Sequence, residues 1–177
     1  MTRLLPALAA ACLLLLSACG FHLRDALTLP PDLGPVRVTA GDPYSPLRQS
    51  LERALGHAGA TIAPTDDERA LTTLAVRSEH WASTPLSVDQ FGRAQEYTLR
   101  YAVVFAMSDA SGDVLVPQQA VELSREYVSV PSDSTGSDTE RELLARELQR
   151  EMTASILRRI DAATREVRAA ATATGRP

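Results

Sequence analysis

The chain has 177 residues, which suits a single domain with one sizeable core and is too short for two. Its 18 basic residues, all arginine, stand against 22 acidic ones, and a formal net charge of −4 gives no support for nucleic-acid binding. The hydrophobic fraction of 45% and the charged fraction of 23% are those of an ordinary globular protein.

Residues 1–18 form a targeting segment. A short basic start is followed by the apolar stretch 4–16, which is too short to span a bilayer comfortably, and the small residues Ser17 and Ala18 then precede Cys19. "LSAC" matches the bacterial lipobox, in which the cysteine thiol receives a diacylglycerol, the signal is removed before it and the new amine is acylated. Because one acyl chain binds a membrane only marginally, several are needed for stable anchoring. The pattern predicts lipid attachment at Cys19; an ordinary signal peptide with a chance cysteine is the alternative.

Signal removal would leave the mature chain without a free thiol. Cys12 leaves with the signal and Cys19 becomes a thioether, so neither a disulfide nor a cysteine metal site can form. Gly20 follows the cysteine, in place of the aspartate that tends to retain enterobacterial lipoproteins at the inner membrane. The sequence therefore favours the cell outer membrane, with the chain lipid-anchored and facing the periplasm.

The next elements are a tether, a strand and a helix. Residues 19–35 form a lipidated tether, because the segment after Cys19 contains three prolines and no sustained period. Residues 36–40 are a short strand candidate. A helix is predicted over 46–57, where Ser45 can cap, Pro46 occupies the first position and leucines recur at three- and four-residue spacing.

Three longer strands are predicted next. Residues 71–84 are rich in strand-forming types, with Leu74, Val76, Ser78 and His80 expected on one face. The clearest strand, 94–109, places one apolar face at every second residue. That face comprises Tyr97, Leu99, Tyr101, Val103, Phe105 and Met107. A hairpin loop at 109–113 leads into a returning strand over 114–130.

The chain ends with a long amphipathic helix. Leu144, Leu148, Met152, Ile156 and Ile160 recur every four residues, which predicts a helix over about 139–161. Residues 162–177 contain few large apolar side chains and are expected to form a flexible tail. The predicted fold of 36–161 is α+β, with order β-α-β-β-β-α and two helices packed on one face of a four-stranded sheet.

Motifs for catalysis or metal binding are lacking. The three histidines, His22, His57 and His80, have no second ligand at metal-binding spacing, and the sequence has no metalloprotease, serine-hydrolase or nucleotide-binding signature. The sequence therefore predicts no catalytic residue, no metal site and no cofactor. A hydrolase assembled from distant residues around His80 is one alternative.

Four arginines are candidate contacts for phosphate groups. Arg93 lies in the loop before the strand 94–109, Arg100 and Arg125 lie on adjacent strands, and Arg141 follows the loop into the last helix. Gathered at one end of the sheet, they could bind phosphate through charge-assisted, two-pronged hydrogen bonds. The alternative is ordinary surface charge.

Several stretches carry a resemblance to a known family. "CGFHLRD" begins at Cys19, "GDPYSPL" precedes the first helix, and "QEYTLRYAVVF" lies in the third strand. Together with the final amphipathic helix, these stretches resemble the LptE family of LPS-assembly lipoproteins over nearly the whole mature chain. The resemblance implies two helices on a four-stranded sheet, in agreement with the prediction from the residues.

The resemblance also implies a partner and a ligand. Members of this family plug the lumen of the outer-membrane β-barrel LptD, assist its assembly and bind lipopolysaccharide. The family's basic positions fall on Gln90 and near Ser137 of this chain, with Arg93 and Arg141 a few residues further on. We therefore expect lipopolysaccharide contacts at Arg93 and Arg141, joined by the two arginines on the adjacent strands. A generic periplasmic lipoprotein that binds lipid or scaffolds the envelope is the alternative.

Overall fold

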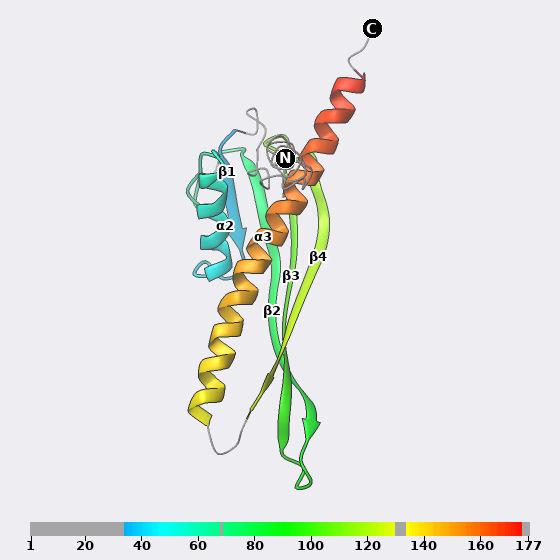
Figure 1. Cartoon of the computed structure of the whole chain (residues 1–177). Helices are drawn as coiled ribbons and strands as arrows, with labels where there is room; N and C mark the ends of the chain where they lie inside the picture. Colours follow the sequence, from blue (N-terminus) through cyan, green and yellow to red (C-terminus); the bar gives the residue numbers. More distant parts are fainter. Residues whose placement is uncertain (1–33, 68, 130–133, 175–177) are drawn as a thin grey trace, which may run out of the picture.

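The computed structural model describes residues 34–67, 69–129 and 134–174 (Figure 1). The predicted signal peptide, Cys19 and nearly all of the tether lie outside these ranges. The elements are β1 (Val36–Ala40), α2 (Pro46–His57), β2 (Thr72–Val88), β3 (Ala94–Ser108), β4 (Val114–Val128) and α3 (Ser134–Thr174). The predicted α+β class and the order β-α-β-β-β-α are confirmed.

One mixed sheet carries the fold. Its strand order is β1-β2-β3-β4, with β1 parallel to β2 and both later pairs antiparallel. Both helices lie on the same side of this sheet (Figure 1), and their apolar stripes join the inward-facing strand residues in one core. The other face of the sheet is covered by no element among the described residues.

Helix α2 has the bounds that the sequence predicts. The Ser45 hydroxyl accepts a hydrogen bond from the backbone N–H of Arg48 at 3.3 Å, and Pro46 opens the helix where a missing N–H has no consequence. Leu47, Leu51 and Leu55 are fully buried against the sheet. Capping and leucine spacing together therefore fix this helix.

Strand β3 is the centre of the core. Its predicted alternation is confirmed, since five side chains of one face are at most 3% exposed: Leu99, Tyr101, Val103, Phe105 and Met107. The hairpin loop at 109–113 is also confirmed, with the Asp109 N–H donating to the Asp113 carbonyl and Gly112 at a φ of 93°. That positive φ suits glycine, which lacks a Cβ.

The prediction of which β2 side chains face the core is correct up to Val76 and wrong for the residues just after it. A β-bulge at Arg77 inserts one residue that has no partner in β3. The alternation reverses at this point, so Glu79 and Trp81 face the core while Ser78 and His80 are exposed on the opposite face. A strictly alternating strand would have placed Ser78 and His80 in the core.

Helix α3 is longer than the sequence predicts. The buried stripe of Leu148, Met152, Ile156 and Ile160 is confirmed, but the helix extends to Thr174 rather than ending near residue 161. Thr164 is still buried, and its hydroxyl donates to the Ile160 carbonyl at 2.9 Å. Alanine and arginine favour helix strongly enough to continue it beyond the large apolar residues. The flexibility of 162–177 stays a prediction. Within the described ranges, no helix is both long and apolar enough to cross a membrane.

A carboxylate links α2 to the sheet. Glu79 accepts a hydrogen bond from the Ser45 hydroxyl and another from the Tyr101 hydroxyl, each at 2.6 Å. Trp81 stacks on Tyr101 with ring centroids 3.9 Å apart. Burial, together with the hydrogen bond to Glu79, raises the pKa of Tyr101 far above its usual value. Tyr101 therefore stays protonated and serves as a donor at any physiological pH.

Replacing this carboxylate tests the link. We expect Glu79→Ala to lower the free energy of unfolding by about 2 kcal/mol, because two hydroxyl groups lose a charged acceptor in a part-buried site. Glu126→Ala, at an exposed position of β4, is the matched control and should change stability by less than about 0.5 kcal/mol. Urea unfolding followed by circular dichroism measures the stability of both variants. If Glu79→Ala unfolded at the same urea concentration as the original chain, Glu79 would have no such role.

Candidate functional site

The four predicted arginines do not form one cluster. Arg93 lies in the turn between β2 and β3, and Arg141 lies in the first part of α3, at the same end of the molecule (Figure 1). Arg100 and Arg125 lie further along the sheet and on opposite faces, because Arg125 pairs with Leu99 rather than with its neighbour Arg100. The structure thus brings two of the four toward one end and separates the others.

Arg93 is held in a structured turn. Its guanidinium pairs with the Asp89 carboxylate at 2.8 Å and lies 5.2 Å from the centre of the Phe91 ring. The same carboxylate accepts the backbone N–H groups of Phe91 and Arg93. The backbone hydrogen bond from Arg93, helped by its guanidinium, holds the pKa of Asp89 below its usual value. The charge of Arg93 is therefore fixed at the tip of the hairpin, and the guanidinium remains largely exposed.

The same hairpin carries exposed apolar side chains that the sequence reasoning missed. Strand β2 extends to Val88 rather than ending at residue 84, and the exposed fractions are 56% for Leu86, 62% for Val88 and 71% for Phe91. We call Leu86, Val88, Phe91 and Arg93 the hairpin tip. The apolar residues at positions 86 and 88, two apart as in a strand, could have predicted this extension of β2. The hairpin tip combines a cation with apolar surface, as a phosphorylated lipid would require.

Arg125 is engaged by the last helix. One of its terminal nitrogens lies 2.6 Å from a Glu151 oxygen and 3.6 Å from a Glu147 oxygen, both on α3. Its place on the helix-covered face makes it a link between β4 and α3. Arg100 pairs with Glu122 at 3.2 Å on the open face, where both side chains are more than half exposed. The Arg141 side chain is exposed and makes no hydrogen bond or ion pair with the residues that the structure describes.

The open face of the sheet is polar around Arg100. Thr98, Arg100, Glu122 and Ser124 share this face on β3 and β4, as the strand alternation predicts. The two exposed histidines lie apart, His80 on the open face and the other at the end of α2. Among the described residues, no group of three His, Cys, Asp or Glu side chains is close enough to hold a metal ion.

Comparisons with known proteins identify the family and agree with the fold. The family model described as "LptE: Lipopolysaccharide-assembly" matches residues 33–160. The LPS-assembly lipoprotein LptE of Photorhabdus laumondii is 27% identical over 158 residues, which cover 89% of this chain and 85% of that protein. Lipoprotein B of Nitrosomonas europaea has a similar solution structure, with a TM-score of 0.68, 25% identity and coverage of 82% of this chain and 92% of that one. The rare lipoprotein B of Shewanella oneidensis shares the fold at a TM-score of 0.62 and 23% identity, over 76% of this chain and 98% of that one. The family model matches most of the chain, which therefore belongs to the LptE lipopolysaccharide-assembly family.

Proposed function

We propose that this chain is a lipid-anchored outer-membrane subunit that plugs the lumen of an LptD-type β-barrel and binds lipopolysaccharide during its insertion into the outer membrane. The role is one of binding and assembly rather than catalysis. The observation that carries the proposal is the uncovered polar face of the sheet in a chain of this family. An uncovered face of this kind suits a polar surrounding such as the interior of a large barrel.

The dimensions of the sheet support a position inside a barrel. Strand β2 has 17 residues, which corresponds to roughly 55 Å at the usual rise of a strand. The hydrocarbon part of a bilayer is only about 30 Å thick. Figure 1 shows the start of β1, where the tether arrives, at the opposite end of the molecule from the β2–β3 turn. A plug of this length would extend through the whole height of a barrel.

The hairpin tip supports lipid binding. Arg93 offers a fixed, exposed cation for a phosphate group, and Leu86, Val88 and Phe91 offer apolar surface for acyl chains. The start of α3, which carries Arg141, lies at the same end of the molecule as the β2–β3 turn (Figure 1). The proposed lipopolysaccharide contacts therefore rest on Arg93 and Arg141. Arg100 and Arg125, which already pair with carboxylates, contribute through the charge of the surrounding surface.

Co-purification tests the plug role. We expect the tagged, natively lipidated chain, extracted in mild detergent, to carry a large outer-membrane β-barrel protein that mass spectrometry identifies. A chain that elutes alone would contradict the plug role. A lipid pull-down at several salt concentrations would then test the generic lipid-binding lipoprotein, and a turnover that depends on His80 would point to a hydrolase instead.

Lipid attachment has its own test. We expect Cys19→Ala to accumulate as an uncleaved or unlipidated precursor, because the thioether that precedes signal removal cannot form. Cys12→Ala is the matched control and should mature normally, since residue 12 leaves with the signal. Intact-protein mass spectrometry of membrane fractions reports both, and normal acylation of Cys19→Ala would refute the prediction.

Charge reversal tests the lipopolysaccharide contacts. We expect the double variant Arg93→Glu, Arg141→Glu to weaken lipopolysaccharide binding by about tenfold or more, because two cationic contacts become repulsive. The double variant Arg53→Glu, Arg158→Glu changes the net charge equally at exposed positions of α2 and α3, and it should bind within about twofold of the original chain.

Binding is measured with purified lipopolysaccharide, and thermal unfolding verifies that both variants are folded. Unchanged binding by a folded Arg93→Glu, Arg141→Glu chain would exclude these two residues as the contacts.

A further inference from the structure

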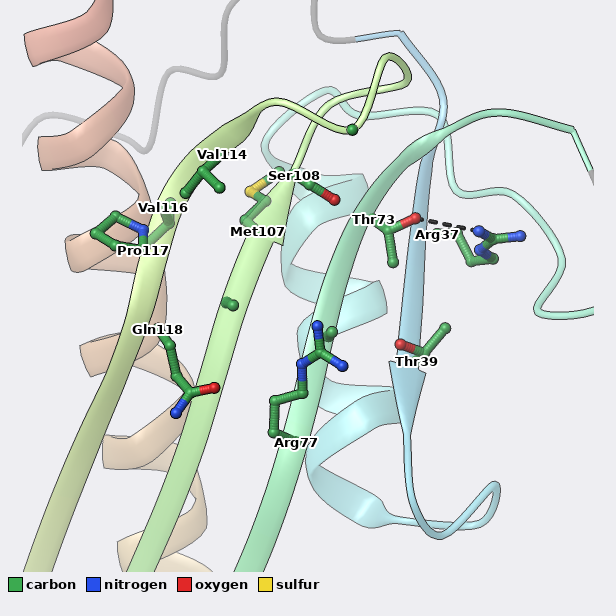
Figure 2. Close-up of a pocket in the computed structure, with 13 residues that line it drawn as sticks. Arg37, Thr39, Thr73, Arg77, Met107, Ser108, Val114, Val116, Pro117 and Gln118 are labelled. Carbon is green, nitrogen blue, oxygen red and sulfur yellow. Dashed lines mark hydrogen bonds between the residues drawn. The ribbon is translucent and has the colours of Figure 1, made fainter.

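A concavity of about 660 Å³ lies on the open face of the sheet, near the 109–113 hairpin (Figure 2). Both helices lie behind the sheet in this view. Small side chains from three neighbouring strands contribute to its lining: Thr39, Thr73, Ala75 and Ala106. Because these side chains are short, a bound group can approach the strand backbones closely. The concavity is remote from the hairpin tip, since β3 runs from one to the other.

Arg77 contributes one cation. It is the extra residue of the β-bulge in β2, and bulges commonly redirect a side chain. Figure 2 shows its side chain extending along β2 in the direction of Thr73. The Arg77 side chain is exposed and makes no hydrogen bond or ion pair with any residue that the structure describes. All the donors of its guanidinium are therefore available.

Arg37 contributes a second, more rigid cation from β1. One terminal nitrogen donates to the Asp67 carbonyl, and the other donates to the Thr73 hydroxyl at 3.2 Å. Its Nε is buried and has no hydrogen-bond partner within the part of the chain that the structure describes. Buried donors are nearly always satisfied in native proteins, so this one needs an acceptor. The hydrogen bonds of the two terminal nitrogens hold the guanidinium in place, while the Nε–H still has no acceptor.

Among the residues that the structure describes, no carboxylate lines the concavity. The nearby Asp67 is occupied by Arg69, whose hydrogen bonds lower the pKa of Asp67 to about 2. Asp109, on the adjoining hairpin, accepts the backbone N–H groups of Ser111 and Asp113 within its own turn. Neither cation of the concavity forms an ion pair with a carboxylate of the described residues, in contrast to Arg93, Arg100 and Arg125, although the charge of Arg37 also acts on Asp67.

We infer that this concavity is a second anion-binding site, in which Arg37 and Arg77 bind a phosphate group. Phosphate fits better than a carboxylate, because its several oxygens can accept from two arginines on different strands and from the hydroxyl group of Thr39. Val114 and Pro117 at the rim give an apolar neighbour to whatever carries the phosphate. The inference goes beyond the proposed function and does not depend on a barrel partner or on the hairpin tip.

Calorimetry of the mature, lipidated chain in non-ionic detergent tests the site, with inorganic pyrophosphate and soluble dihexanoyl phosphatidic acid as probes. We expect saturable binding at low salt and a loss of about tenfold in affinity in Arg77→Gln. Arg53→Gln is the matched control: it removes the same charge from an exposed position of α2, where the guanidinium bonds only within its own helix, and should bind within about twofold of the original chain.

Arg77→Gln should unfold at the same temperature as the original chain, because glutamine keeps the extra residue of the bulge and the Arg77 side chain makes no hydrogen bond or ion pair with any described residue. Arg37→Gln, with its fold verified in the same way, should weaken binding as well. Tighter binding of phosphatidic acid than of pyrophosphate would identify a lipid headgroup as the source of the phosphate, and equal affinities would identify a free phosphate compound. The inference is overturned if neither probe binds, or if Arg77→Gln binds both as the original chain does.

Discussion

One unpaired residue in β2 sets the two faces of this sheet. The bulge at Arg77 reverses the alternation of the residues that follow it, as far as the next irregularity after Pro85. A shift of one residue moves the side chains of a strand to the opposite face. Trp81 and Glu79 reach the core only for this reason. Glu79 can then accept hydrogen bonds from Ser45 and Tyr101, which attaches the start of α2 to the middle strands. The packing of the first helix and the character of the open face both depend on this residue.

The two faces then meet different requirements. The covered face buries the apolar stripes of two helices, and Arg125 adds ion pairs that hold α3 against β4. The open face retains hydroxyl, carboxylate and guanidinium groups that are costly to bury without partners. A surface of this type is stable in water or against another polar surface. The arrangement therefore fits a subunit that is enclosed by a partner without merging its core with that partner.

Most of the fold could be predicted from the sequence because its signals are local. Ser45 and Pro46 predict the start of α2, and the strict alternation of apolar residues predicts β3. The bulge could not be predicted, because Arg77 and Ser78 are both polar and either register leaves an acceptable pattern nearby. The end of α3 was placed too early because alanine-rich turns have high helix propensity without an apolar stripe.

The candidate site was harder to predict than the fold. Arg100 and Arg125 are close in the sheet, but their faces depend on which residue of β3 lies opposite Arg125, and only the register reveals that it is Leu99. The exposed apolar residues at the hairpin tip had a visible signal in their spacing. Arg37 and Arg77 had no signal in the sequence, since they are forty residues apart in the chain and only the pairing of β1 with β2 brings them to one site. Cys19 lies outside the described residues, and its lipid attachment stays a prediction.

The position of β1 has a mechanical consequence. A chain held by its N-terminus would transmit any pull from the membrane into the fold at Val36. The N–H of Val36 donates to the Thr61 carbonyl and its carbonyl accepts from the Ala63 N–H, while β1 pairs in parallel with β2 on its other side. A force along the strand would load these bonds together in shear rather than opening them one at a time. The shortest strand of the sheet is thus placed where the domain can resist a force applied through the residues before it.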